Sequence, residues 1–332
     1  KLRASYGTSG NDQIGDYQYL DTYQLSPYLY NGVVGLTPSR LYNPDFSWES
    51  NKKLELAIET GFLKDKIFLS AAWFQNRSSN QLIGVPLPGT TGFPTIQSNF
   101  NATVENTGLE FELRTWNIKL KDFSWTTNFN LTVPKNKLIA FPNLETSTYA
   151  NLLVLGESLF IRKVYDFTGI DPTTGTYTFR DFDGDGQITP DKDRRAIADT
   201  SPKYFGGISN QFVYKNWALD CLLQFVSQQG RNYQSTTPIA GTLANQPSEM
   251  ANHFPQNGNS AVAQLYSTGL NSNVVIAYYN LLDSNAAYGD ASYIRMKNIS
   301  LSYTLPSTWS KIFNGKVYIQ GQNLSRLQNS KG

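Results

Sequence analysis

Apolar and polar side chains alternate along several stretches of this chain with a period of two residues. In the stretch 123–133 the even positions carry Ser, Thr or Asn, and the odd positions are mostly aromatic or aliphatic. The same alternation recurs at 54–62, 109–114, 217–226 and 299–305. Because successive side chains of a β-strand point to opposite faces, this period predicts strands with one apolar and one polar face.

The alternating runs and the turn residues between them predict nine strands. Several strands exceed about ten residues, whereas strands of globular proteins cluster near five or six. A tilted strand needs about 9–11 residues to cross a bilayer, so these lengths suit a membrane barrel. The predicted strands are 1–6, 52–62, 67–80, 104–117, 123–134, 203–214, 217–228, 291–305 and 316–326.

Short and long connections alternate between these strands. The short ones are 63–66, 118–122, 215–216 and 306–315, and the long ones are 7–51, 81–103, 135–202 and 229–290. Tight periplasmic turns and long extracellular loops are typical of outer-membrane barrels. A soluble sandwich would mix its loop lengths, and structureless loops this long are uncommon in compact soluble domains. The predicted fold class is therefore all-β, an antiparallel transmembrane β-barrel fragment with long extracellular loops.

An open sheet of nine strands has two free edges, which lipid does not tolerate. Each unpaired backbone group costs several kcal/mol in the hydrocarbon region, so a sheet that crosses the membrane must close. Lys1 starts inside a predicted strand, and Gly332 follows another one closely. We therefore expect the remaining strands of the barrel upstream of Lys1 and downstream of Gly332.

Aromatic residues are abundant, with 20 Tyr, 19 Phe and 6 Trp. Several stand beside the short turns: Phe62 precedes one, and Phe123, Trp125 and Trp217 follow one. Aromatic rings gather at membrane interfaces because they tolerate the boundary between headgroups and acyl chains. This interpretation predicts an aromatic girdle at the turn end of the strands. The alternative is that aromatic residues simply favour strands.

Composition excludes several kinds of function. The net charge is +2 without a basic run, so nothing indicates binding to nucleic acid. Cys221 is the single cysteine and His253 the single histidine, which excludes a disulfide within the chain and zinc sites built from these residues. A histidine-based catalytic triad is a poor fit, and we predict that the chain is not an enzyme. No apolar run reaches the roughly 18 residues of a membrane-spanning helix, which leaves β-barrels as the membrane class.

One acidic segment, DFDGDGQITPDKD at 181–193, has the spacing of a calcium-binding loop. Aspartates stand at its first, third and fifth positions and a glycine at the sixth, where the loop turns sharply. A hard cation needs about six to eight oxygen ligands that converge from one tight turn. We predict a structural Ca²⁺ here, which would order a long exposed segment. The predicted ligands are Asp181, Asp183, Asp185, the backbone carbonyl of Gln187, and Asp193.

The twelfth position of this segment departs from the calcium pattern. A bidentate carboxylate belongs there, and this chain has Lys192. A one-residue bulge near Pro190 would bring Asp193 to that place. The alternative is a solvated Asp/Gly turn without a metal, whose charges are offset by Arg180, Lys192, Arg194 and Arg195. A glycosidase-like carboxylate pair is disfavoured, since nothing here indicates an apolar pocket that would raise a pKa.

Seven segments, taken in order, resemble one known family. They are YNPDFSWESNKKLELAIETGFL, TVENTGLEFEL, FSWTTNFNLTVPKNKLIAF, RDFDGDGQIT followed by DR, SPKYFGGISNQFVYKNWALDCLLQF, DASYIRMKNISLSYTLP and VYIQGQNL. They are similar to the C-terminal barrel portion of SusC/RagA-type TonB-dependent outer-membrane transporters of Bacteroidetes, over nearly the whole chain. That family usually has an acidic residue directly before the Arg of the DGDG segment; Asp193 and Arg194 fit, with one extra residue after Gly186.

The resemblance implies a barrel of about 22 strands with an N-terminal plug domain that is not in this sequence. Residues 1–332 would be the C-terminal part of this barrel, with extracellular loops at 135–202 and 229–290. The implied function is uptake of oligosaccharides or peptides across the outer membrane, driven by the TonB complex through the absent N-terminal region. The implied partners are a SusD-like surface lipoprotein and outer-membrane lipid, and no organic cofactor is implied.

Other functions stay open at this point. A surface-exposed, β-rich glycan-binding module would show loops of mixed length and polar residues on both faces. A passive porin-like channel would lack the plug upstream. A barrel enzyme such as a lipase or protease would need a nucleophile beside a base, which the single histidine makes a poor fit.

Overall fold

The computed structural model describes residues 1–11, 17, 20–43, 47–251, 263–306 and 315–328. His253 lies outside these described residues. The chain divides into two compact units. The first is Lys1–Glu59, Ala71–Leu109 and Pro134–Leu159, and the second is Thr60–Ser70, Glu110–Val133 and Phe160–Gly332. Within the described ranges, no helix is long and apolar enough to cross a membrane.

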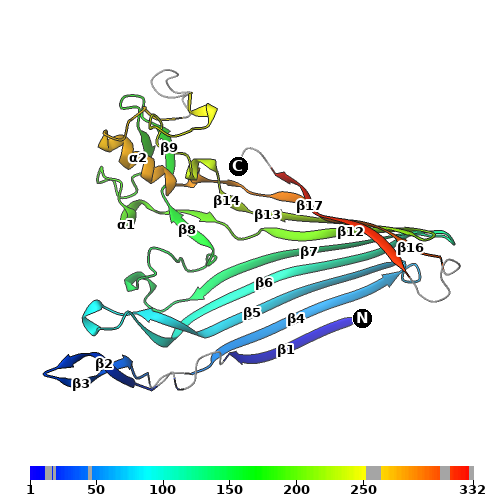
Figure 1. Ribbon diagram of the computed structural model, residues 1–332, viewed down its shortest axis with the longest axis horizontal. Coiled ribbons are helices and arrows are strands. Elements are labelled where there is room, and N and C mark those ends of the chain that lie inside the picture. Colours follow the sequence, from blue (N-terminus) through cyan, green and yellow to red (C-terminus); the bar gives the residue numbers. More distant parts are fainter. Residues whose placement is uncertain (12–16, 18–19, 44–46, 252–262, 307–314, 329–332) are drawn as a thin grey trace. The chain divides into compact units, whose positions relative to one another are not determined.

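One antiparallel sheet contains all nine of the predicted strands, which confirms their positions (Figure 1). Its members are hydrogen-bonded in the order in which they follow along the chain, with β1 and β17 at the two ends of that order in the described residues. The strands are β1 (Leu2–Asn11), β4 (Glu49–Phe62), β5 (Ile67–Pro86), β6 (Thr95–Lys119), β7 (Phe123–Ala140), β12 (Tyr204–Tyr214), β13 (Trp217–Ser227), β16 (Tyr293–Thr304) and β17 (Lys316–Gln328).

The pairing register of β7, β12, β13, β16 and β17 separates an apolar face from a polar face. One transverse row of paired residues is wholly apolar: Trp125, Phe212, Leu219, Leu301 and Ile319. The next row, which points to the opposite face, is wholly polar: Thr126, Gln211, Asp220, Ser300 and Gln320. The apolar positions predicted for each strand therefore line up with those of its neighbours. A sheet with one apolar and one polar face requires this register.

The predicted connection 81–103 is wrong in its length. Strands β5 and β6 continue into it and leave only 87–94 between them, which is shorter than the connection at 305–315. Long and short connections therefore alternate less strictly than predicted. The extension of β6, TIQSNFNAT, is rich in Asn and Thr, and the extension of β5, QLIGVP, is interrupted by Gly and Pro. Neither continues the regular apolar alternation by which the rest of each strand is recognised.

A two-stranded hairpin occupies part of the predicted connection 7–51. It consists of β2 (Thr22–Tyr30) and β3 (Val33–Arg40), joined by Asn31 and Gly32. Both turn residues have positive φ, 51° and 79°. An Asn-Gly pair between two β-forming runs is a strong hairpin signal, so this element was recognisable from the sequence.

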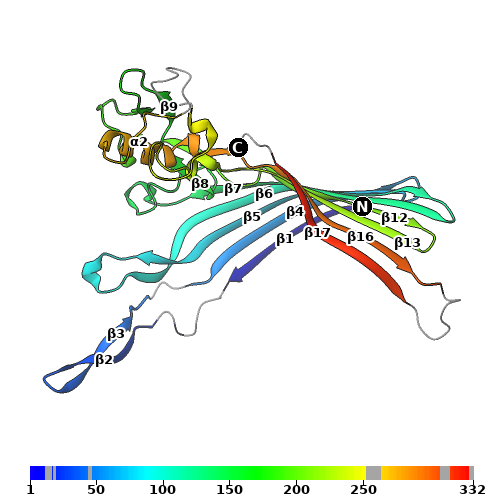
Figure 2. The same cartoon turned by 45° about the horizontal axis from the view of Figure 1, so that its top comes forward.

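Smaller elements of the second unit lie within the other long connections, and several of them pack around a common core (Figures 1 and 2). Tyr165, Tyr177 and Phe179 pack there with Ala277 and Leu281 of the helix α2. The elements are β8 (Ile161–Val164), β9 (Phe167–Ile170), β10 (Tyr177–Phe179), α1 (Pro190–Asp193), β11 (Ala196–Asp199), β14 (Gln229–Arg231), α2 (Ser272–Leu282) and β15 (Tyr288–Asp290), with 3-10 turns at Tyr233–Ser235, Ser248–Ala251 and Asn285–Ala287. We call this group the loop layer.

The first unit has a separate small core. It is formed by Ala102, Val104, Leu138, Phe141 and Leu144, with the rings of Phe100 and Phe141 in an edge-to-face contact at 4.4 Å between centroids. The remaining 3-10 turns, Gly89–Thr91 and Leu144–Thr146, lie in this unit.

Candidate functional site

The acidic segment runs between β10 and β11 of the loop layer and ends in the short helix α1. Gly184 and Gly186 have φ of +74° and +79°, in the left-handed region that favours glycine. Thr189 is the residue before the helix, and Pro190 is its first residue, where a missing N–H costs nothing. The Asp/Gly spacing thus gives two tight turns followed by a helical turn.

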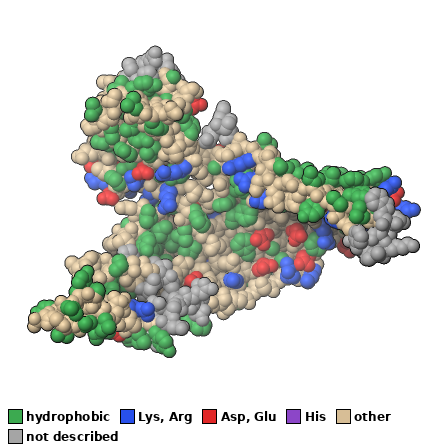
Figure 3. Space-filling model, in the orientation of Figure 1, with side chains coloured by type: hydrophobic (Ala, Val, Ile, Leu, Met, Phe, Trp, Pro, Cys, Tyr) green, Lys and Arg blue, Asp and Glu red, His purple; other side chains and the backbone are tan. Residues whose placement is uncertain are grey.

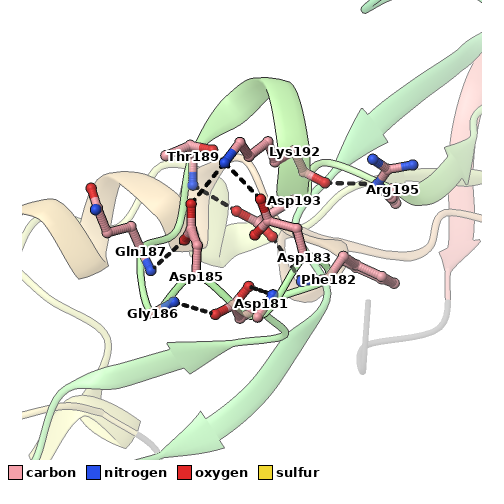
Figure 4. A network of polar contacts seen from close by, with 11 residues as sticks. Asp181, Phe182, Asp183, Asp185, Gly186, Gln187, Thr189, Lys192, Asp193 and Arg195 are labelled. Carbon is pink, nitrogen blue, oxygen red and sulfur yellow. Dashed lines mark hydrogen bonds and ion pairs between the residues drawn. The ribbon is translucent and has the colours of Figure 1, made fainter.

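Two carboxylates hold this loop in shape by accepting hydrogen bonds from its own backbone (Figure 4). Asp181 accepts from the N–H groups of Gly184 at 2.7 Å and Gly186 at 2.8 Å. Asp193 has no exposed surface, and its two oxygens accept from the N–H groups of Phe182 and Thr189, both at 2.8 Å. Buried charge is tolerated only where such bonds are made, so Asp193 has a structural role in the loop.

Lys192 supplies the positive charge that faces the remaining aspartates (Figure 4). Its Nζ lies 2.7 Å from Asp183 Oδ2 and 2.8 Å from Asp185 Oδ2. The ammonium holds the pKa of Asp183 and of Asp185 below the ordinary value of an aspartate. In turn the two carboxylates raise the pKa of Lys192. At neutral pH all three groups are therefore charged.

The structure brings some of the predicted calcium ligands together and places others apart. Oxygens of Asp181, Asp183 and Asp193 lie within 4.8 Å of one another, the one such acidic group among the described residues. Asp185 is outside this group and pairs with Lys192, and the backbone N–H of Gln187 donates to Asp185 Oδ1 at 2.8 Å. The helical turn of α1 brings Asp193 inward, so no bulge is needed. Three of five predicted ligands thus converge.

Of the four basic residues expected to offset the acidic charge, one does so directly. Lys192 pairs with two aspartates of the loop. Arg180 pairs with Asp166 outside it, at 3.3 Å. Arg195 donates through Nε to the carbonyl of Lys192 at 2.7 Å and so braces the helical turn. Arg194 makes its ion pair elsewhere, as described next.

Arg194 joins the acidic loop to the segment that follows α2. Its guanidinium lies 2.7 Å from Asp283 Oδ2 and 4.9 Å from the centroid of the Tyr165 ring. Burial raises the pKa of the Tyr165 hydroxyl, which stays protonated. The backbone of Tyr165 bonds to the carbonyl of Asp283 and the N–H of Asn285, both at 2.9 Å. Direct contacts thus join residues that lie more than a hundred positions apart in the sequence.

The sequence interpretation missed helix α2, although a capping signal marks it. Asn271 Oδ1 accepts hydrogen bonds from the N–H groups of Asn273 and Val274, as an N-cap residue does. Val274, Ala277 and Leu281 are buried at helical spacing. Reading LNSNVVIAYYNLL as a capped amphipathic helix would have placed this element inside the predicted loop 229–290.

Aromatic rings gather on the apolar face near the short turns, as predicted. Trp125 stacks on Phe212 with centroids 5.4 Å apart, and Trp217 lies 4.7 Å from Tyr303. Residues 215–216 connect Tyr214 directly to Trp217. The rings are therefore grouped on one face at one end of the strands, and their contact with a membrane interface stays a prediction.

The sequence family described as TonB dependent receptor-like, beta-barrel, matches residues 1–324. A TonB-dependent receptor named P3 from Formosa agariphila is 28% identical over an alignment of 360 positions, which covers 98% of this chain and 34% of the relative. The TonB-dependent receptor SusC from Bacteroides thetaiotaomicron is 23% identical over an alignment of 359 positions, which covers 100% of this chain and 34% of the relative. The chain thus spans about a third of the length of these curated relatives.

Solved structures of the RagAB peptide importer have the same fold. The structure of its "closed-closed" state superposes with a TM-score of 0.80 and 23% sequence identity, over 100% of this chain and 37% of that chain. The "open-open" state gives a TM-score of 0.78 with 22% identity, over 100% of this chain and 37% of that chain. At this identity the likeness establishes the fold.

Proposed function

This chain belongs to the TonB dependent receptor-like β-barrel family, and from that membership we propose that it is part of the wall of a transporter that takes up oligosaccharides or peptides. Members of this family are outer-membrane proteins and are transporters rather than enzymes. The observation that carries the proposal is the continuous apolar row across five strands, backed by a polar row on the opposite face.

The two rows explain how the wall would work. Apolar side chains toward lipid keep the acyl chains in contact with hydrocarbon, and hydrogen bonds between neighbouring strands satisfy the backbone groups that lipid cannot. The polar row, in which Gln211 Nε2 donates to Asp220 Oδ1 at 2.8 Å, would line the interior through which a hydrated cargo passes. Energy would enter from the TonB complex through a plug domain outside the present sequence.

Helix α2 of the loop layer is the proposed contact surface for a SusD-like surface lipoprotein, and the layer is also the proposed surface for cargo. Helix α2 buries one side in the layer and exposes apolar side chains on the other, with Ile276 58% and Tyr279 59% exposed. Leu270, just before the helix, is 92% exposed. Exposed apolar patches of this kind mark protein interaction sites. Figure 3 shows hydrophobic side chains gathered over this layer.

A calcium ion in the acidic loop is a separate proposal, supported by the convergence of Asp181, Asp183 and Asp193. These oxygens suit a hard cation, which would tie the loop together by charge. The position of Lys192 Nζ sets a condition: a metal would have to displace this ammonium from Asp183. Two positive charges therefore compete for Asp183: a bound calcium ion and the ammonium of Lys192, which already pairs with it.

The transport proposal is tested with the full-length receptor in its own cell. Deletion of the receptor should abolish growth on one oligosaccharide or peptide mixture as sole carbon source, and so should loss of TonB. Growth through the receptor that persists without TonB would identify a passive pore, and binding of a glycan without any uptake would identify a surface module. Either result would contradict the proposal.

The partner proposal has its own test. Exchange of Ile276 and Tyr279 for Glu should prevent the lipoprotein from co-purifying with the full-length receptor. Ile197→Glu on β11, a residue that is also exposed at 41%, is the matched control and should leave co-purification intact. Equal co-purification of all variants would show that α2 does not bind the lipoprotein.

A further inference from the structure

Lysines are concentrated at the end of the sheet where its short connections lie. The connections 63–66, 120–122 and 215–216, and the start of β17, all lie at this end because consecutive strands are antiparallel. Their acidic side chains, among the described residues, are Asp65 and Asp122. We use the name turn lysines for Lys64, Lys66, Lys119, Lys121, Lys215 and Lys316, all of which are exposed.

Backbone hydrogen bonds join these connections into one continuous border. The N–H of Trp116 donates to the carbonyl of Lys66 at 2.7 Å, and the N–H of Lys215 donates to the carbonyl of Asp122 at 2.9 Å. The N–H of Thr304 donates to the carbonyl of Asn216 at 2.9 Å. The turn lysines are therefore a line of positive charge along one edge of the wall. Figure 3 shows Lys and Arg side chains at this end of the sheet.

The turn lysines have no carboxylate partner among the described residues, whereas Lys192 in the loop layer has two. Asp65 and Asp122 stand beside lysines in sequence, yet neither forms an ion pair within the described residues. Two of the ammoniums lie over aromatic rings instead: Lys119 is 4.9 Å from the Trp116 centroid and Lys215 is 5.4 Å from the Tyr214 centroid. The positive charge of this border is therefore left for an external anion.

A transverse row of aromatic residues lies on the apolar face immediately beside the border. Phe123, Tyr214, Trp217 and Tyr303 are consecutive partners in the pairing register, and Tyr214 and Trp217 are about half exposed, at 54% and 48%. Aromatic rings settle at the level where headgroups meet acyl chains. Lysines just beyond them reach the level of the lipid phosphates, with their aliphatic stems along the apolar surface.

We propose that the turn lysines form a binding site for anionic glycerophospholipids, of the phosphatidylglycerol type, in the leaflet that this end of the barrel crosses. The lipid phosphate supplies the missing counter-charge, and the acyl chains lie on the apolar face below the aromatic row. A lysine near an anionic lipid surface favours binding about fivefold. The charge is spread as a line along the boundary of the apolar face, which suits a ring of headgroups better than a compact acidic protein surface.

The test uses the full-length receptor in liposomes and spin-labelled lipids, whose immobilised fraction reports contact with the protein. Labelled phosphatidylglycerol is compared with labelled phosphatidylcholine. The turn variant combines Lys64→Ser, Lys66→Ser, Lys121→Ser and Lys215→Ser. The control variant removes the same charge near the other ends of the strands, through Lys52→Ser, Lys53→Ser, Lys135→Ser and Lys203→Ser.

The unchanged receptor and the control variant should immobilise phosphatidylglycerol about two- to fivefold more strongly than phosphatidylcholine, and less so at high salt. The turn variant should show no preference, and arginine at the same positions should restore it, which excludes misfolding as the cause. Selectivity that survives in the turn variant would mean that the lysines face an acidic protein or water. Equal loss in the control variant, or binding of lipid A in place of phosphatidylglycerol, would also overturn the proposal.

Discussion

The acidic loop depends most on Asp193, whose carboxylate is fully buried. Asp193→Ala removes the acceptors of two backbone N–H groups, those of Phe182 and Thr189, each of which lies 2.8 Å from a carboxylate oxygen. Both donors lose their bonds inside the loop, because a methyl group cannot accept. A bond to a charged group contributes about 1.5–3 kcal/mol, so the free energy of local unfolding should fall by about 3–6 kcal/mol.

One effect opposes this loss. Oxygens of Asp181 and Asp183 lie within 4.8 Å of an oxygen of Asp193, and removal of one negative charge relieves their repulsion. The net destabilisation should therefore lie near the lower end, at about 3 kcal/mol. Asp193→Asn removes the same charge and keeps one acceptor, so its loop should be intermediate in stability.

Hydrogen exchange of the full-length receptor measures this local stability. A loss of about 3 kcal/mol should speed exchange in peptides that contain Phe182 and Thr189 by about a hundredfold. Peptides from β13 should exchange as before, since the sheet does not depend on this carboxylate. If hydrogen exchange of the loop peptides in Asp193→Ala stays within a factor of about three of the rate in the unchanged receptor, the role assigned to Asp193 is refuted.

Three further predictions concern the same loop. Lys192→Met frees Asp183 and Asp185, so terbium, which substitutes for calcium, should bind at least about tenfold more tightly by luminescence; unchanged weak binding would exclude a cation site. Gly186→Ala places a Cβ at φ +79° and should cost about 1–2 kcal/mol, seen as faster exchange of the loop, whereas Gly186→Asn should cost less. Because the pKa values of Asp183 and Asp185 are depressed in the folded loop, their contribution is complete above the unfolded value of about 3.9 and is lost as pH falls through the folded values. Exchange corrected for intrinsic pH effects should therefore quicken only below about pH 4, and a change near neutral pH would contradict this assignment.

The nine long strands were predictable because each of them must place apolar side chains on the same face of the sheet. A wall with lipid on one side must alternate at every strand, and rows such as Trp125, Phe212 and Leu219 repeat that requirement across the sheet. Strand ends outside the apolar zone lose this constraint. That is why the extension of β5 beyond residue 80 and of β6 before residue 104 did not show in the pattern.

The loop layer was not predictable in the same way, since its core joins distant segments. Tyr165 and Phe179 bury against Ala277 and Leu281, and neither aromatic residue stands in a long periodic run. Short strands stabilised by such packing have no local signature. The acidic loop is intermediate: the spacing of its aspartates predicts the tight turns, but only the fold shows that Lys192 lies between two of them.

The central claim is that the apolar face of the sheet touches acyl chains, and strand β13 tests it most directly. In the full-length receptor, Cys221 and any cysteine outside the present sequence are replaced, and spin labels are then placed one at a time along 217–226 in liposomes. Collision with oxygen reports lipid, and collision with a polar nickel complex reports water. Labels at Trp217, Leu219, Cys221 and Leu223 should favour oxygen, and those at Asp220 and Gln224 should favour nickel. Collision rates without a two-residue period, or with the two faces exchanged, would contradict the account.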